Sequence, residues 1–428
     1  MTTHARFLVG LIGGVSLSPG ALGCAGGVEP KSDGAGGGGV SASAGAAGSG
    51  GSTATGGVGA EGGGAGGATG GTTGGGAAGM TGGGSAGASG STGMPITAPA
   101  NEWTWVGDST ARCRDASEAG FGIRINPASD RLMIFLEGGG ACFNGVTCAT
   151  SPSSFGPGQF QSWKTNGGTR GLFDRARDEN PVKDWSHVYV PYCTGDVHAG
   201  ARPDASGIAG IAGTNQFVGY TNMTQFLRRI AATFPDATQV LLTGVSAGGF
   251  GATANFPQTQ RLFGDIPVTL IDDSGPPMSR TYITECLQER FRTSWGLDQT
   301  LLADCGPACP NENDYLADYA RFLASYGNRT VSLISSRADS VITFFYGFGL
   351  NDCPAFALPM PPAMFAQGLD ELRGSLWAGY SNVGTFFVNG ATHTFLGGND
   401  FYSTSAAGTS LVSWVAHVLA GSPSHVGP

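Results

Sequence analysis

A serine nucleophile is indicated by the G-x-S-x-G pattern of residues 244–248, which places Ser246 between two glycines. The apolar run 239–243 before the pattern is typical of a strand, and residues 248–256 after it are typical of a helix. A sharp turn between strand and helix exposes the serine hydroxyl, and the N–H of Ala247 then faces the oxygen of an attacked carbonyl. A structural Gly-Ser turn is the alternative, but this context favours a nucleophile.

A second glycine-rich turn, Glu137-Gly138-Gly139-Gly140, follows the strand-like run 132–136. A loop without side chains lets its N–H groups approach the negative charge that develops on an attacked carbonyl oxygen. One such donor contributes about 2.7–4 kcal/mol to the transition state. We therefore predict that this turn supplies part of an oxyanion hole rather than a plain flexible loop.

A serine hydroxyl needs a base, and three histidines follow Ser246 in the chain. His393 lies in a loop after the strand-like run 384–388, where the base is expected when serine, acid and histidine come in that order. His417 falls within a helical pattern, and His425 falls in a tail of Ser, Pro and Gly. We therefore predict that His393 is the general base.

The acid that orients the base should follow another strand. Asp339 comes after the strand-like run 330–334 and before the base, and it is our prediction for this role. Asp272 and Asp273, which follow the preceding strand-like run, and Asp352, which stands beside a cysteine, remain as alternatives.

These residues must be positioned by an alternation of strands and helices along residues 96–428. Most strand-like runs are apolar on both faces, as in parallel strands that helices cover on both sides. We predict an α/β sandwich with a mainly parallel central sheet and helices on both faces. The predicted strands are 132–136, 187–191, 239–243, 266–271, 330–334 and 384–388. The predicted helices are 223–234 with Asn222 as its N-cap, 248–256, 315–323, 364–377 and 411–419, and 144–185 is a predicted long loop with a short helix.

The first 24 residues are typical of a lipoprotein export signal, in which small residues after an apolar run lead to a lipidated Cys24. The alternative is ordinary signal-peptide cleavage, in which Cys24 is not lipidated. Residues 25–95 are rich in Gly, Ser, Ala and Thr without an aromatic residue, which predicts a disordered tether. We expect a protein of the cell envelope, at the outer membrane or cell surface, or a secreted one, with its folded domain in residues 96–428.

Removing Cys24 leaves eight cysteines, and an even number in an exported chain favours disulfides. Cys142 and Cys148 enclose a short loop and are the one pair that we predict. The spacing of Cys305 and Cys309 resembles part of a zinc site, but no histidine stands nearby at ligand spacing. We expect neither a metal nor an organic cofactor.

The net charge of −9 comes without a cluster of Lys or Arg, so we expect no nucleic-acid partner. No run of 18 apolar residues occurs in the sequence. We therefore expect membrane contact only through the lipid at Cys24.

Three blocks, 135–144, 188–198 and 244–249, resemble the signature sequences of the pectin acetylesterase/Notum family, and the sequence looks closer to its bacterial members. The resemblance implies an α/β-hydrolase-like fold and a Ser–Asp–His carboxylesterase mechanism. It assigns Ser246 as the nucleophile, Asp339 as the acid, His393 as the base, and Gly139, Gly140 and Ala247 as the oxyanion donors. Plant and animal members usually have Trp near Ala141, so their exact substrates do not transfer to this chain.

The sequence thus predicts an exported serine carboxylesterase that removes O-acetyl groups from a polysaccharide. One alternative is a lipid or protein deacylase, which would need a deep apolar tunnel beside Ser246, and another is a non-catalytic surface-binding module. His198 precedes the nucleophile in the chain and is expected in the wall of the cleft. The aromatic residues that either stack on sugar rings or pack in the core are Phe143, Phe155, Phe160 and Trp163.

Overall fold

The computed structural model describes residues 93–208, 210–353 and 357–428. The predicted export signal, Cys24 and almost all of the tether 25–95 lie outside these residues. Within them, no helix is both long and apolar enough to cross a membrane. The strands are β1 (Thr104–Arg112), β2 (Glu118–Arg124), β3 (Arg131–Leu136), β4 (Ser186–Val190), β5 (Arg202–Ala205), β6 (Asn215–Phe217), β7 (Gln239–Val245), β8 (Val268–Asp273), β9 (Val331–Ser336), β10 (Val383–Val388), β11 (Ser405–Ala406), β12 (Thr409–Ser410) and β13 (His425–Val426).

Helices of several lengths connect these strands. The α-helices are α2 (Gly145–Thr150), α3 (Pro157–Asn166), α4 (Gly219–Thr233), α5 (Ala247–Phe263), α6 (Glu285–Trp295), α7 (Leu301–Cys305), α8 (Tyr315–Ala324), α9 (Ile342–Gly347), α10 (Pro362–Glu371), α11 (Asp400–Ser403) and α12 (Leu411–Leu419). The 3₁₀ turns are η1 (Gly167–Thr169), η2 (Gly171–Phe173), η3 (Leu297–Gln299) and η4 (Gly306–Ala308), and η5 (Leu372–Leu376) is a π-helical turn after α10.

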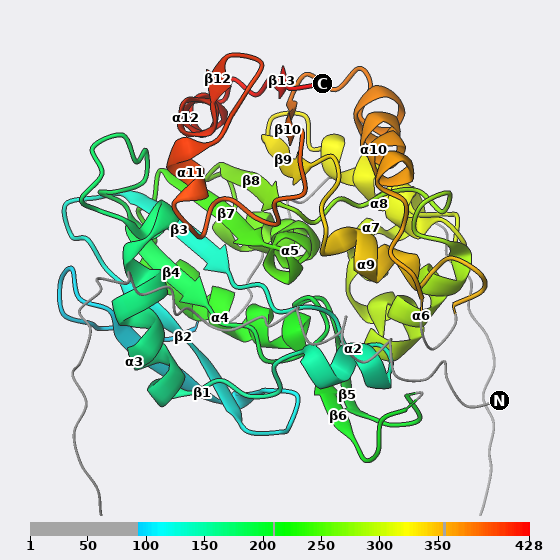
Figure 1. Cartoon of the computed structure of the whole chain (residues 1–428). Helices are drawn as coiled ribbons and strands as arrows, with labels where there is room; N and C mark the ends of the chain where they lie inside the picture. Colours follow the sequence, from blue (N-terminus) through cyan, green and yellow to red (C-terminus); the bar gives the residue numbers. More distant parts are fainter. Residues whose placement is uncertain (1–92, 209, 354–356) are drawn as a thin grey trace, which may run out of the picture. The chain divides into compact units, whose positions relative to one another are not determined.

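A nine-stranded sheet has the order β1-β2-β4-β3-β7-β8-β9-β10-β13 (Figure 1). All neighbours from β4 to β13 are parallel, and β1 and β2 form an antiparallel edge. The mainly parallel α/β sandwich is therefore confirmed. Because parallel strands end at one edge of a sheet, the loops that follow β3, β7, β8, β9 and β10 are neighbours there.

Both faces of the sheet are covered, as the continuous apolar strands predict. Along β3, Leu132, Ile134 and Leu136 belong to one hydrophobic core, whereas Met133 and Phe135 belong to the other. This alternation follows from the two-residue period of a strand. Helices α4, α5, α8 and α10 supply side chains to the first core, and α3, α11 and α12 supply them to the second.

The predicted capping role of Asn222 is wrong, because α4 begins at Gly219. Asn222 lies inside the helix and is buried. Its side-chain oxygen accepts the N–H of Arg112 at 3.1 Å, and its amide nitrogen donates to the carbonyl of Arg112 at 2.7 Å. The amide therefore satisfies the end of strand β1 instead of the start of its own helix.

Helix α5 continues past Pro257, although a proline normally ends a helix by removing one hydrogen bond. The carbonyl that loses its donor is that of Thr253, four residues earlier. The Tyr319 hydroxyl of α8 donates to this carbonyl at 3.2 Å and to that of Ala254 at 3.3 Å. A tertiary contact thus supplies the missing donor, and the helix runs seven residues beyond the predicted end at 256.

Four disulfides join eight cysteines of the described residues: Cys113–Cys193, Cys142–Cys148, Cys286–Cys353 and Cys305–Cys309. The pair predicted across residues 142–148 is present, but Cys148 lies in α2 rather than in a loop. The segment 144–185 contains α2, α3 and two 3₁₀ turns, so it is more ordered than predicted.

The aromatic residues proposed as sugar-stacking groups mostly pack against one another. Phe143 and Phe160 are fully buried. Trp163 is half-buried, and its ring stacks on that of Tyr189 with centroids 3.6 Å apart. This arrangement favours the core-packing alternative for these side chains.

Candidate active site

Ser246 stands at a strained turn between β7 and α5. Its φ of +58° is rare for a residue with a side chain, and such strain is typical of a nucleophile elbow. A Cβ added at Gly244 would overlap the backbone of Gly248, and one added at Gly248 would overlap that of Leu136. Both glycines of the motif are therefore required by the close crossing of backbones at this turn.

The Glu137–Gly140 turn follows β3 and lies against the elbow. A Cβ on Gly138 would come within 2.5 Å of the Val245 carbonyl oxygen and 2.9 Å of the Ser246 Cβ. Among the described residues, nothing accepts a hydrogen bond from the N–H groups of Gly139, Gly140 or Ala247. The Ala247 N–H also belongs to the first turn of α5, where the helix dipole favours negative charge.

Tyr192, which sequence reasoning did not single out, braces this turn. Its hydroxyl donates to the Gly140 carbonyl at 2.9 Å and accepts the N–H of Val197 at 2.9 Å. Its own N–H donates to the Glu137 carboxylate at 3.0 Å. Its place two residues after β4, the strand that pairs with β3, was the signal that could have indicated the contact.

His198 supports the same turn through a hydrogen bond, and it is not in the wall of an open cleft as predicted. It is buried, and its Nε2 lies 2.9 Å from the Glu137 carbonyl oxygen. Burial lowers the pKa of His198 to about 4, so the ring is neutral at pH 7 and Nε2–H is the donor. Burial also raises the pKa of Glu137, opposed by the hydrogen bond from the Tyr192 N–H.

His393 and Asp339, far apart in sequence, meet at the ends of β10 and β9. The His393 Nδ1 lies 2.8 Å from Oδ2 and 3.0 Å from Oδ1 of Asp339. Asp339 is fully buried, and its Oδ1 also accepts the N–H groups of Val341 and Ile342 at 2.9 Å each. An Nδ1–H held by this carboxylate leaves Nε2 of His393 free to accept a proton.

The alternative acids do not contact the imidazole of His393 through hydrogen bonds. Asp272 accepts the Thr253 hydroxyl at 3.0 Å, and Asp352 is exposed. Asp273 accepts the backbone N–H groups of Phe395 and Leu396 at 2.7 Å each. Among the four predicted candidates, only Asp339 is hydrogen-bonded to the ring.

The alternative histidines lie elsewhere. His417 is exposed on α12, and its Nδ1 lies 2.7 Å from the Ser413 carbonyl oxygen of the same helix. His425 lies in β13, with its Nδ1 3.0 Å from the Thr385 hydroxyl. The structure therefore brings Asp339 and His393 together, whereas His417 and His425 make their hydrogen bonds elsewhere.

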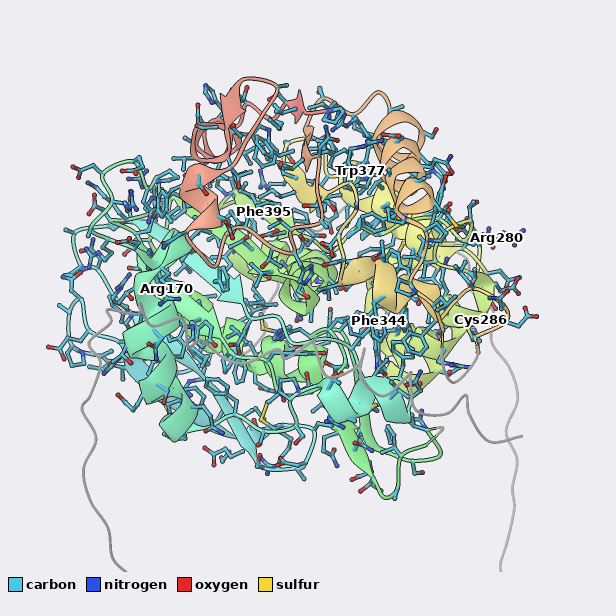
Figure 2. The ribbon with its side chains drawn as sticks, viewed as in Figure 1. Arg170, Arg280, Cys286, Phe344, Trp377 and Phe395 are labelled. Carbon is cyan, nitrogen blue, oxygen red and sulfur yellow. A yellow bond between two sulfur atoms is a disulfide. The ribbon has the colours of Figure 1, made fainter. Side chains whose placement is uncertain are left out.

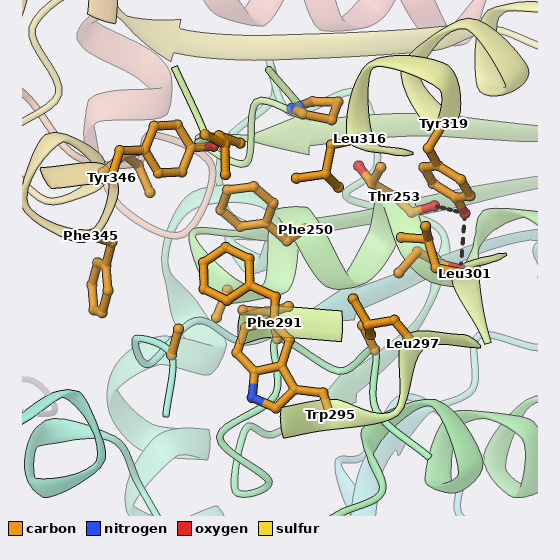
Figure 3. Close-up of a pocket in the computed structure, with 18 of the residues that line it drawn as sticks. Phe250, Thr253, Phe291, Trp295, Leu297, Leu301, Leu316, Tyr319, Phe345 and Tyr346 are labelled. Atoms are coloured by element: carbon orange, nitrogen blue, oxygen red, sulfur yellow. Dashed lines mark hydrogen bonds between the residues drawn. The ribbon is translucent and has the colours of Figure 1, made fainter. Parts of the chain in front are cut away.

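An apolar pocket that opens to solvent has Ser246 in its wall. None of the residues that line it carries a charge, and most come from the segment 277–346 and from α5. Figure 3 shows Phe250 and Phe291 in the middle of the pocket, Tyr346 towards one end and Tyr319 towards the other. Gly140 and Ala247 lie on the wall as well, so the pocket adjoins the candidate oxyanion hole.

A family model described as Pectinacetylesterase matches residues 99–336. The chain belongs to this family. It therefore falls in a family of carboxylic ester hydrolases, and the match contains Ser246 and the turn 137–140 but ends before Asp339 and His393. The assignment of the acid and the base consequently rests on the geometry above.

Known relatives of this pectinacetylesterase-family chain include Notum proteins. The chain is 28% identical over 224 residues to palmitoleoyl-protein carboxylesterase NOTUM of Drosophila melanogaster, covering 48% of this chain and 33% of that protein. It is 29% identical over 178 residues to the Mus musculus NOTUM, covering 39% and 34%. An inactive palmitoleoyl-protein carboxylesterase, notum1b of Danio rerio, is 34% identical over 100 residues, covering 22% and 70%. The chain thus spans about a third of the length of the first two relatives.

The fold is also that of a solved Notum structure. The Wnt deacylase Notum from Drosophila superimposes with a TM-score of 0.54 at 20% sequence identity, covering 77% of this chain and 96% of that one. The predicted α/β-hydrolase-like architecture of the family is therefore confirmed.

Proposed function

We propose that this protein is a serine carboxylesterase in which Ser246 is the nucleophile, His393 the base and Asp339 the orienting acid. The hydrogen-bonded Asp339–His393 pair, at the same sheet edge as a strained serine, is the observation that carries the proposal. The disulfides support the predicted export, because such bonds persist in oxidising compartments.

The reaction begins when the Ser246 Oγ attacks the ester carbonyl carbon and Nε2 of His393 takes the hydroxyl proton. The N–H groups of Gly139, Gly140 and Ala247 stabilise the negative charge on the carbonyl oxygen. His393 then gives its proton to the leaving alcohol as the ester C–O bond breaks. Water repeats both steps on the acyl-enzyme and releases the acid.

The apolar pocket supports an acyl group longer than acetyl. An acetyl group ends in one methyl next to Ser246, whereas the uncharged wall of the pocket continues past Phe250 to Leu301 and Tyr319. The deacylase alternative required a deep apolar tunnel beside Ser246, and an apolar pocket with Ser246 in its wall supports this alternative. We therefore place the substrate among esters of apolar fatty acids, in preference to the acetylated polysaccharide suggested by the resemblance.

The length of the acyl chain follows from α5, because pocket residues recur along one face of this helix from Ser246 to Ala254. Eight residues at about 1.5 Å each span roughly 12 Å of the pocket wall. An extended carbon chain advances about 1.2 Å per bond, because the three backbone bonds of an extended residue together span about 3.5 Å. The pocket therefore suits an acyl chain of roughly ten carbons.

The test measures the hydrolysis of p-nitrophenyl esters, from acetate to palmitate, by the folded domain (residues 96–428) and by its Ser246→Ala variant. We expect kcat/KM to rise by roughly fourfold per methylene, from about 0.8 kcal/mol for each buried CH₂, up to about ten carbons. Ser246→Ala should lose at least about 10³-fold. Equal loss with every ester in a folded protein identifies the nucleophile, whereas retained activity would contradict it.

Ala254→Leu tests the pocket, because the larger side chain would enter its deep end. Leu316→Trp is a second variant at a half-buried wall position, in case the first does not fold. Both should lose activity on decanoate and keep it on butyrate, so the short ester is the control within each variant. Highest activity on acetate in the wild type would instead favour the acetylesterase, and failure of Ser246 to react with a fluorophosphonate would favour the non-catalytic module.

A further inference from the structure

Asp273 contacts both halves of the candidate catalytic machinery, although it is not hydrogen-bonded to the His393 ring. It is the last residue of β8, which lies between β7, the strand before Ser246, and β9, the strand before Asp339. Its main chain and its side chain bind different parts of the site. These contacts hold the nucleophile and the base in place and take no part in the proton transfers.

The side chain holds the loop that carries the base. One oxygen of the Asp273 carboxylate accepts the N–H groups of Phe395 and Leu396, each at 2.7 Å. These are the second and third residues after His393, and Figure 2 shows Phe395 near the ends of β7 and β8. Thr394, between the base and this clamp, has a φ of +66°, an unfavourable conformation that the surroundings must maintain.

The main chain of Asp273 holds the nucleophile. Its carbonyl oxygen accepts the N–H of Ser246 at 2.8 Å. One residue therefore fixes the backbone of the serine and, through a rigid buried carboxylate, the backbone beside the histidine. Ser274 anchors the other carboxylate oxygen through a hydroxyl donor at 3.0 Å.

From this geometry we propose that Asp273 is a positioning residue that keeps His393 in register with Ser246. The inference rests on the proposed esterase function. Asp339 acts on the imidazole ring and selects its tautomer, whereas Asp273 acts on the main chain that carries the ring. Loss of the clamp should therefore lower the rate of attack by Ser246 more than the binding of substrate.

The charge of Asp273 is part of this role, because hydrogen bonds to a carboxylate are about twice as strong as neutral ones. Burial raises the pKa of Asp273 to about 6, opposed by the two N–H donors and by His393. The group is therefore mainly ionised at pH 7.5.

Asp272 is the matched control, since it is the neighbouring carboxyl of the same strand and is also buried. Its side chain bonds to Thr253 of α5 and makes no hydrogen bond to the 393–396 loop. Burial raises the pKa of Asp272 to about 8, so it is mainly protonated at pH 7.5 and its replacement by Asn changes little charge.

The experiment compares Asp273→Asn with Asp272→Asn at pH 7.5, using kcat and KM on p-nitrophenyl octanoate and the rate of fluorophosphonate labelling of Ser246. We expect Asp273→Asn to lose roughly 10- to 100-fold in kcat and in labelling rate, with KM within about twofold, because small misplacements of catalytic groups carry costs of this size. Asp272→Asn should stay within about threefold of the wild type. Asp273→Ala, which leaves both N–H groups without an acceptor, should be worse than Asp273→Asn.

Wild-type kcat and labelling in a folded Asp273→Asn protein would overturn the proposal, and so would equal losses in the two Asn variants. Hydrogen exchange of the Phe395 and Leu396 amides separates this proposal from the esterase function. Faster exchange at these amides in Asp273→Ala than in Asp272→Asn supports the clamp even if the wild type hydrolyses no ester. Unchanged exchange overturns the clamp even if the wild type is a good esterase.

Discussion

Replacing Asp339 with Asn should abolish most of the activity while keeping the fold. Oδ1 of Asp339 accepts three N–H donors, from Val341, Ile342 and His393, and Oδ2 lies 2.8 Å from Nδ1 of His393. The two backbone donors can be satisfied only by the oxygen of the new amide. The NH₂ group of Asn is then placed against Nδ1 of His393.

An amide donor facing Nδ1 selects the wrong tautomer of the ring. Nδ1 must give up its proton to accept the new hydrogen bond, so the proton moves to Nε2, which can then no longer accept the proton of the serine hydroxyl. The expected loss in kcat is up to roughly 10⁴-fold, or about 5.4 kcal/mol at about 1.36 kcal/mol per tenfold. The free energy of unfolding should fall by only about 1 kcal/mol, because the backbone donors keep a neutral acceptor.

The assay is kcat on p-nitrophenyl octanoate at pH 7.5, with fluorophosphonate labelling as a second measure of Ser246 reactivity and circular dichroism as the measure of folding. Asp273→Asn and Asp272→Asn are controls with a buried carboxyl at the end of the neighbouring strand. The losses should rank Asp339, then Asp273, then Asp272. A folded Asp339→Asn protein with more than about a tenth of wild-type kcat would refute the reasoning, and a larger loss in Asp273→Asn would move the acid to β8.

Three further predictions concern Tyr192, Asp272 and residues 25–95. Tyr192→Phe leaves the Gly140 carbonyl and the Val197 N–H without their hydrogen-bond partner. We expect kcat to fall roughly tenfold with KM little changed, and Tm to fall. Unchanged kinetics would show that the hydroxyl does not support the oxyanion turn. Between about pH 4 and pH 8, Asp272 keeps its proton in the folded protein but has lost it in the unfolded chain. The free energy of unfolding therefore falls as pH rises through this window, by up to about 1.4 kcal/mol per pH unit. Asp272→Asn should flatten the slope of Tm against pH, and an unchanged slope would contradict the raised pKa. Deleting residues 25–95 should leave kcat and Tm unchanged, and a clear drop in Tm would show that the predicted tether belongs to the fold.

Local patterns predicted the central strands and the turn at the nucleophile. Strands buried on both faces are continuous apolar runs, and β3, β7 and β10 lie within two residues of their predicted bounds. The G-x-S-x-G motif depends on backbone crowding at one turn, which involves residues close in sequence and the neighbouring strand end. Such features can be predicted because period, glycine placement and burial are all properties of a short window.

Other elements were predicted less well, because distant residues decide them. Pro257 predicts the end of a helix, but the hydroxyl of Tyr319, 62 positions later, supplies the lost hydrogen bond. Asn222 is a good N-cap by type, but the end of β1 provides a buried partner for its side chain. The edge strands β1 and β2 were not predicted, and they follow from the pairing of β2 with β4 and of β1 with β2 rather than from apolar runs of their own.

The sequence by itself determined the family, the serine at its elbow and the few Asp and His residues that follow later strands. It did not determine which carboxylate reaches the imidazole, since Asp272 and Asp273 end one strand and Asp339 follows the next. The tertiary structure decided this. Sheet order and register bring the Asp339 carboxylate within hydrogen-bond distance of the His393 ring and the Asp273 carboxylate within hydrogen-bond distance of the Phe395 N–H. The acyl pocket is also a product of tertiary structure, because its walls come from segments between residues 140 and 346 that are joined only by folding. Hydrogen bonds and cavities of this kind depend on distances between remote segments, and no local pattern encodes those distances.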